Sequence, residues 1–146
     1  VEVYDAGGDS SARLINLSTR GFVGTDDDVM IPGFVATGAT ARTFLIRAAG
    51  PALERLSVRG TLANPEIRVV SASSGLTVAR NDDWSGVPNS AAALTEEFRR
   101  VGAFPFMPGS RDAALLVTLP AGLYTVVCSG YARTTGLALV EVYEMP

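Results

Sequence analysis

The chain has 146 residues, a net charge of −3 and no histidine, and lysine is absent too, so its twelve basic residues are all arginine. Without histidine or lysine there is no Ser-His or Cys-His nucleophile pair, no imidazole ligand for zinc and no Schiff base. We therefore expect a protein that is not an enzyme. The arginines are spread along the chain, with only Arg99 and Arg100 adjacent, so they form no basic stripe, which argues against nucleic acid as a partner.

Apolar residues make up 47% of the chain and charged residues 18%, values that are typical of one globular domain of this length. No run approaches the roughly 20 apolar residues of a membrane helix, so we expect no membrane span. The single cysteine, Cys128, has no partner for an internal disulfide. Its place in the run YTVVCSG predicts a buried strand residue, and the alternative is a reactive or intermolecular thiol.

Short β-rich runs separated by Gly, Pro, Asn, Asp and Ser recur along the whole chain. This pattern predicts an all-β fold, an antiparallel β-sandwich with a jelly-roll or Ig-like arrangement. The two runs on either side of Pro120-Ala121-Gly122 are predicted to pair as a hairpin, since proline fixes one turn dihedral and glycine permits positive φ. In chain order the expected strands are residues 1–4, 12–18, 21–24, 29–36, 43–48, 66–72, 76–80, 113–119, 123–129 and 137–143.

One segment departs from the β pattern and predicts a short α-helix at residues 90–101. Its apolar side chains recur at spacings of three, four and three residues, which places them on one helical face: Ala91, Leu94, Phe98 and Val101. Asn89 or Ser90 would cap the first turn, and Gly102 stands where helices commonly end.

A second, shorter helical turn is expected over residues 51–56. In that turn Leu53 and Leu56 would both face inward. Both helical segments are expected to lie over an edge or an end of the sandwich.

The two ends of the chain carry nearly the same sequence. Val1-Glu2-Val3-Tyr4-Asp5 matches Val140-Glu141-Val142-Tyr143-Glu144 at four of five positions. Self-similarity at the length of one domain is typical of a tandem array. Residues 1–5 are therefore interpreted as a terminal strand equivalent to residues 140–144 of a preceding repeat, and residues 6–146 as a single β-sandwich module. The alternative is a chance match between two Val/Tyr strands.

Two nearly identical strands would compete for one place in the sheet, so one of them is free to serve a neighbour by strand addition. Contacts of this kind do not close on themselves, and they generate filaments or linear arrays from copies of the chain or from neighbouring modules. The valines of both segments are expected to point inward. The expected assembly residues are Val1, Val3, Tyr4, Val140, Val142 and Tyr143.

The chain contains the motifs ARLINLSTRGFVGTDDDVMIPGFV, TFLIRAAGPAL, NDDW, DAALLVTLPAGLYTVVCSG and TGLALVEVYE. With them it resembles, over nearly its whole length, a roughly 140-residue β-sandwich module that is tandemly repeated in large secreted proteins of verrucomicrobial-type bacteria. The usual pattern of that module includes N-[LV]-S-[TS]-R near its start and A-L-V-E-[VI]-Y-[DE] at its end. More faintly, the closing strands resemble sandwich domains appended to secreted peptidases. The resemblance implies secretion and repetition, hence an extracellular or cell-surface location, and implies no chemistry.

We expect no cofactor, with calcium as the alternative, and two acidic segments are candidate sites for it. Asp26, Asp27 and Asp28 follow Gly24-Thr25 in a turn and would supply oxygen ligands. The competing interpretation is an ordinary solvated turn, because no EF-hand spacing follows.

The second segment combines Asp82 and Asp83 with Trp84, the only tryptophan. An exposed Trp84 beside these carboxylates would stack on a sugar of a polysaccharide, or the acids would bind calcium. The competing interpretation has Trp84 closing one end of the sandwich.

Asp82 and Asp83 with Glu96 or Glu97 do not have a spacing that a glycosidase carboxylate pair demands. Three functions remain, in this order: a non-catalytic structural module that forms arrays or filaments, a carbohydrate- or calcium-binding accessory module of a secreted protein, and a small hydrolase.

Overall fold

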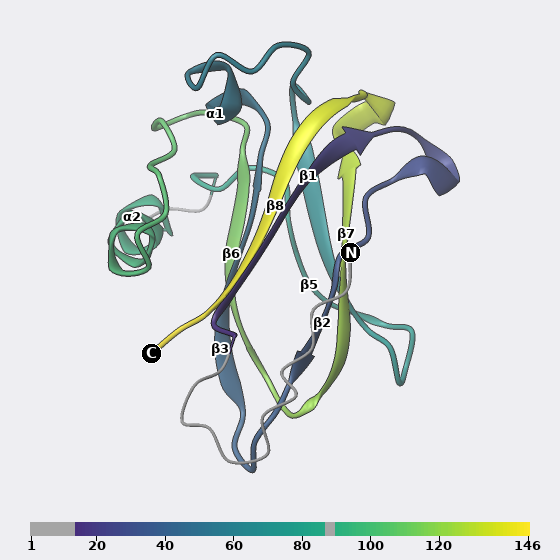
Figure 1. Cartoon of the computed structure of the whole chain (residues 1–146), viewed down its shortest axis with the longest axis vertical. Coiled ribbons are helices and arrows are strands. Elements are labelled where there is room, and N and C mark those ends of the chain that lie inside the picture. Colours follow the sequence, from purple (N-terminus) through teal and green to yellow (C-terminus); the bar gives the residue numbers. More distant parts are fainter. Residues whose placement is uncertain (1–13, 87–89) are drawn as a thin grey trace.

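A computed structural model describes residues 14–86 and 90–146, which form two four-stranded antiparallel sheets (Figure 1). The prediction of an all-β antiparallel sandwich is confirmed. Sheet A has the order β1 (Asn16–Val23), β8 (Gly136–Glu144), β3 (Arg42–Ala49) and β6 (Ala113–Leu119). Sheet B has the order β2 (Gly33–Ala36), β7 (Gly122–Gly130), β4 (Pro65–Ser71) and β5 (Thr77–Asn81).

The strand order identifies the sandwich as a jelly roll. β1 pairs with β8, β2 with β7, β3 with β6 and β4 with β5, all antiparallel. The chain thus resembles one long hairpin, with its tip between β4 and β5, that has been rolled into two sheets. Further pairing of β8 with β3 and of β7 with β4 joins these pairs into the sheets.

The predicted hairpin around Pro120-Ala121-Gly122 is wrong. β6 and β7 belong to different sheets, so this connection carries the chain from sheet A to sheet B. The hydroxyl of Tyr124 donates to the carbonyl of Pro120 at 3.0 Å and fastens the turn. Alternating patterns show which side chains face the core, and they do not distinguish strands that pair edge to edge from strands that pack face to face.

Two other strand predictions change at the N-terminal side. Residues 12–18 and 21–24 were expected as separate strands, and the structure has one strand, β1, because Gly21 continues the pairing opposite Ala138. The expected strand 29–36 shortens to β2, because Pro32 has no N–H to donate to a ladder. The expected strand 1–4 lies outside the described residues.

The main core fills the space between the two sheets. Cys128 lies there without solvent exposure, which confirms its prediction as a buried strand residue. The largest fully buried side chains of this core come from both sheets and, for Leu62, from the segment before β4: Val23, Ile46, Leu62, Ile67, Val69, Val126 and Val140.

A second core lies on the outer side of sheet A. β3 is buried on both faces from Phe44 to Ala49, because α2 (Ser90–Arg100) and the segment 101–112 cover that side of the sheet. α2 lies beside β6 (Figure 1). The predicted helix is confirmed: Leu94 and Phe98 are buried in this core. The predicted cap Asn89 lies outside the described residues.

α1 (Pro51–Glu54) is a single turn at one end of the sandwich (Figure 1). Leu53 is buried as expected, but Leu56 is 57% exposed, so its predicted inward orientation is wrong. The helix ends at Glu54, and Leu56 lies in the turn that follows, where its N–H donates to the Leu53 carbonyl at 2.9 Å before the chain changes direction at Ser57, whose φ is 64°. Two short 3-10 segments, η1 (Asp26–Asp28) and η2 (Tyr131–Arg133), complete the secondary structure.

Candidate functional site

The repeated end sequence occupies an interior position in sheet A. β8 pairs with β1 over eight residues and with β3 over six, so it has hydrogen-bonded neighbours on both sides. It begins at Gly136, where a Cβ would lie 2.6 Å from the Leu62 nitrogen and where φ is +156°. Only glycine meets both conditions at that point.

The four residues from Val140 to Tyr143 alternate between two environments, one on each side of sheet A. Val140 and Val142 point into the sandwich core and are 1% and 5% exposed, as the alternation predicts. Glu141 and Tyr143 point to the opposite side of the sheet, toward the second core. The sequence is therefore matched to this strand position residue by residue, beyond a general preference for valine.

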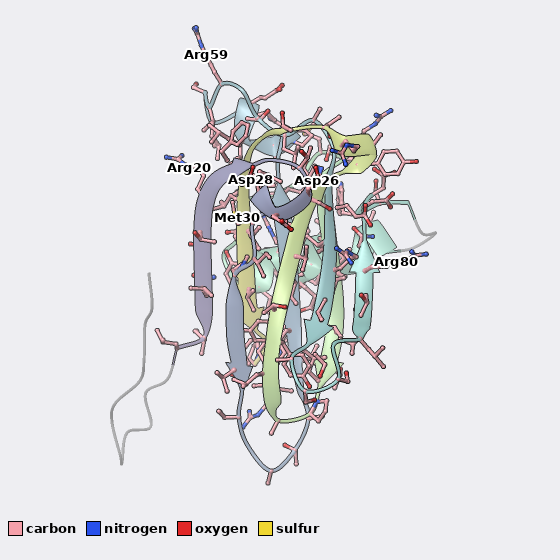
Figure 2. All side chains as sticks on the ribbon, turned by 90° about the vertical axis from the view of Figure 1, so that its right-hand side faces the viewer. Arg20, Asp26, Asp28, Met30, Arg59 and Arg80 are labelled. Carbon is pink, nitrogen blue, oxygen red and sulfur yellow. The ribbon has the colours of Figure 1, made fainter. Side chains whose placement is uncertain are left out.

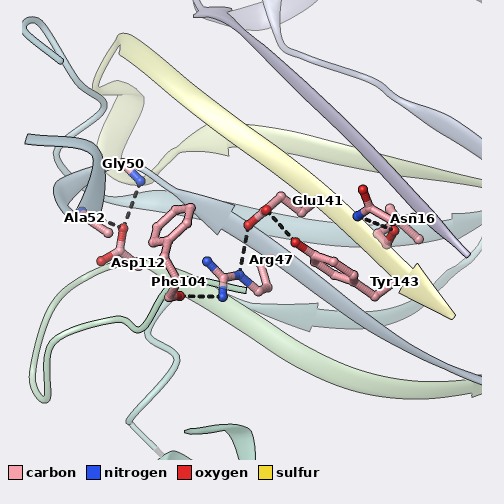
Figure 3. A network of polar contacts seen from close by, with 9 residues as sticks. Asn16, Arg47, Gly50, Ala52, Phe104, Asp112, Glu141 and Tyr143 are labelled. Carbon is pink, nitrogen blue, oxygen red and sulfur yellow. Dashed lines mark hydrogen bonds and ion pairs between the residues drawn. The ribbon is translucent and has the colours of Figure 1, made fainter. Parts of the chain in front are cut away.

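Arg47 on β3 is the partner of Glu141. Its Nε lies 3.0 Å from Oε2 of Glu141, as an ion pair without the alignment of a hydrogen bond. Its Nη1 donates to the carbonyl oxygen of Phe104 at 2.8 Å (Figure 3). The hydroxyl of Tyr143 donates to Oε1 of Glu141 at 2.7 Å. One carboxylate thus joins a charged group of β3 to a phenol of its own strand.

Three phenyl rings surround the Arg47 guanidinium. Its central carbon lies 4.4, 4.6 and 4.2 Å from the ring centroids of Phe98, Phe104 and Phe106. Contacts of this kind stabilise a cation that has lost its water, and arginine is suited to them because its guanidinium is planar and weakly hydrated. Phe106 also contacts Phe98 and Phe104 edge-on, at interplanar angles of 71° and 65°.

Burial sets the electrostatics of this network. Loss of water lowers the pKa of Arg47, and the negative charge of Glu141 opposes that shift. Burial also raises the pKa of Tyr143, and its hydrogen bond to Glu141 adds to the effect. Tyr143 therefore remains a protonated donor at neutral pH. The arrangement holds charges in fixed places and links strands.

Asp112 forms the other end of the network. It is fully buried, and its Oδ1 accepts from the backbone nitrogens of Gly50 and Ala52 at 2.8 and 3.1 Å. Its Oδ2 accepts from the Ser110 hydroxyl at 2.7 Å. Asp112 thereby satisfies the free N–H groups at the start of α1, and its charge also favours the protonated form of Arg47.

The three carboxylates of the acidic turn, Asp26 to Asp28, are not gathered around one position. The two oxygens of Asp26 accept from both terminal nitrogens of Arg133 at 2.8 Å each, and this contact lowers the Asp26 pKa. Asp27 and Asp28 are exposed. Figure 2 shows Asp26 and Asp28 in the loop that follows β1. Among the described residues no group of three or more acidic or cysteine side chains is placed to bind a metal ion.

Trp84 is 2% exposed and packs against Phe98 and Phe106 in the second core. Its indole N–H donates to the Ser110 hydroxyl at 3.2 Å. This position agrees with the interpretation of Trp84 as a plug, and it leaves the ring no open face for a sugar. The neighbouring Asp82 and Asp83 are half-buried, and the Asp83 carbonyl accepts from the Asn81 side chain.

The remaining assembly residues of the prediction, Val1, Val3 and Tyr4, lie outside the described residues. The sequence interpretation missed Arg47 and Asp112. One signal for Arg47 was present: it is the only charged residue inside the apolar run Phe44 to Ala49, and a buried arginine requires a partner. Its aromatic neighbours follow more than fifty residues later, and no local pattern connects them.

Comparison with protein-family models, with curated proteins and with solved structures gave no match. In the part of the chain that the structure describes, neither helix has the length and apolar character needed to cross a membrane.

Proposed function

We propose that this chain is a non-catalytic structural module that works outside the cell or at its surface and assembles into linear arrays through its terminal strand sequence. The observation that carries the proposal is the residue-by-residue match between the Val140 to Tyr143 sequence and its place in β8. Two valines enter the core, the glutamate pairs with a buried arginine, and the tyrosine donates to that glutamate.

This match supports a shared role for the repeated sequence at residues 1–4, and it argues against a chance resemblance. A chance resemblance would require only valines at alternate positions of a strand. The second copy also has Glu2 and Tyr4 at the positions where β8 has Glu141 and Tyr143. It therefore has the composition of a strand that places valines in a core and its glutamate beside an arginine of the adjacent strand.

In this chain the position for such a strand, between β1 and β3, is already occupied by β8. β8 has paired neighbours on both sides, and a five-residue segment has fewer ladder positions than the nine residues of β8. In this proposal residues 1–5 serve another copy or a neighbouring module in place of the chain's own sheet A. A segment that serves the next copy gives a contact that repeats from one molecule to the next.

The test is the assembly size of the full chain as its concentration is raised, measured by light scattering and electron microscopy. We expect arrays from the native chain and their loss in the variant Val1→Asp/Val3→Asp. Two acids placed on the inward face of a strand prevent its burial. The matched control, Ser10→Asp/Ser11→Asp, adds the same charge nearby and should assemble normally. Equal assembly by both variants, or a native chain that stays monomeric, would refute the proposal.

A further inference from the structure

We propose that the acceptor for residues 1–5 of a second copy is the outer edge of β1, beside which no described strand lies. This inference rests on the proposed function and identifies the partner surface for the terminal segment. Of the strands that the structure describes, four lie at sheet edges: β1 and β6 in sheet A, and β2 and β5 in sheet B. An edge strand presents unpaired backbone groups that another strand can bind, unless the protein blocks them.

Three of the four edges are short, irregular or occupied. β2 has only four residues. β5 has an irregular register against β4, between Val69 and Val70. At β6, the backbone N–H of Ala114 donates to the side-chain oxygen of Asn81 at 2.9 Å, which ties this edge to β5 of the other sheet. These features are the ones by which natural sheets discourage strand addition.

β1 has none of these features. Its eight residues pair with β8 in one continuous register, and its other side has no strand among the described residues. The inward positions of β1 are half-buried at Leu17, Thr19 and Gly21, and Val23 alone is fully buried. Thr19 and Gly21 are small, so valines on an added strand would find room beside them.

The opposite sheet is also incompletely covered on this side. Met30 and Phe34 are only partly buried, although both pack against the main core. Met30 reaches toward β1, since a Cβ on Gly21 would lie 3.2 Å from the Met30 Cε. An added strand with valines inward would extend sheet A and shield this part of the core from water.

Charge complementarity fixes the register. Arg20 is exposed on the outer face of β1 (Figure 2), and it has no ion pair with any residue that the structure describes. An antiparallel strand with Glu2 opposite Arg20 places Val1 beside Gly21 and Val3 beside Thr19. Inside the molecule the same relation already exists, because Glu141 is the register partner of Arg47.

The occupant is a second copy of this chain, and reversal of the two charges tests it in the full-length protein. We expect Arg20→Glu and Glu2→Arg each to raise the concentration needed for assembly by about tenfold or more, since like charges would then meet in the interface. The double variant Arg20→Glu/Glu2→Arg should restore assembly. Arg80→Glu, which reverses an exposed arginine on the β5 edge, is the matched control and should assemble as the native chain does.

Hydrogen exchange supplies the second measurement. We expect β1 amides to gain protection as the native chain assembles, with no such gain in β5. Failure of the double variant to recover, or protection that appears at β5 instead, would overturn the β1 assignment. Equal protection of β1 at every dilution would also overturn it, because the chain's own segment would then cover the edge. If Val1→Asp/Val3→Asp disrupts assembly while the charge reversals have no effect, the proposed function stands and the acceptor is elsewhere.

Discussion

Nε of Arg47 and Oε2 of Glu141 lie 3.0 Å apart on neighbouring strands, and both side chains are shielded from water. Removing two charges from water is costly, and their attraction offsets that cost only while both are present. The pair also selects a register: a slip of β8 by one residue would turn Glu141 into the sandwich core. We infer that the pair contributes more to the uniqueness of the strand pairing than to net stability.

Glu141→Gln should lower the free energy of unfolding by about 3–5 kcal/mol, because it leaves the Arg47 charge buried without a counter-charge. Urea denaturation measures the loss. The control is Asp26→Asn, which breaks the exposed pair with Arg133 and should leave the unfolding midpoint nearly unchanged. In Arg47→Met/Glu141→Met both charges are removed, and this variant should be more stable than Glu141→Gln. A double variant that is less stable would show that the pair itself is strongly stabilising.

Asp112→Ala should lower the free energy of unfolding by about 3 kcal/mol, since it leaves the N–H groups of Gly50 and Ala52 without an acceptor. Asp112→Asn retains one acceptor oxygen and should lose less. Thermal unfolding of the two variants gives the comparison. Equal losses would mean that the charge of Asp112, rather than its acceptor oxygen at α1, accounts for the effect.

Cys128 should not react with a thiol reagent at pH 8 while the protein is folded. Burial raises its pKa from 9.0 to about 12, and the thiolate is the reactive form. Because the folded pKa is the higher one, this group's contribution to stability is complete below pH 9 and is lost as pH rises toward 12. A colorimetric thiol assay followed through urea unfolding gives an unambiguous result, since this is the only cysteine. Fast labelling of the folded chain would contradict the burial.

Trp84 should emit as a buried indole and resist quenching by acrylamide. Calcium or oligosaccharides should leave its emission unchanged, because its ring packs against Phe98 and Phe106. Unfolding in urea should shift the emission to the red and serves as the positive control. A spectral change on addition of a glycan to the folded protein would revive the carbohydrate-binding alternative.

The sequence predicted the parts of the fold that depend on local pattern. Alternation located most strands to within a few residues, and the spacing of Leu94 and Phe98 located α2. Pairing was not predictable in the same way, because the partner of each strand lies elsewhere in the chain and proximity in sequence suggested β6 with β7. The rolled topology makes that guess wrong at every connection except the one between β4 and β5.

In the candidate site, too, local pattern predicted some features, and contacts between distant residues determined the others. The inward orientation of Val140 and Val142 followed from alternation alone. The role of Glu141 did not, because it depends on Arg47 and on Phe104, which lies 57 residues from Arg47. A glutamate in an alternating strand has the same pattern whether it faces solvent or a buried cation.

The interior place of β8 has a consequence for how the chain acquires its structure. Asn16 on β1 donates to the carbonyl of Val142, 126 residues further on, so sheet A closes only when the last strand arrives. Contacts between such distant residues form slowly. During synthesis, Arg47 would lack its counter-charge until β8 has been synthesised. For the same period β3 would lack one of its two neighbouring strands. An interrupted chain that ends before Gly136 would expose this open sheet, and we expect it to aggregate or be degraded.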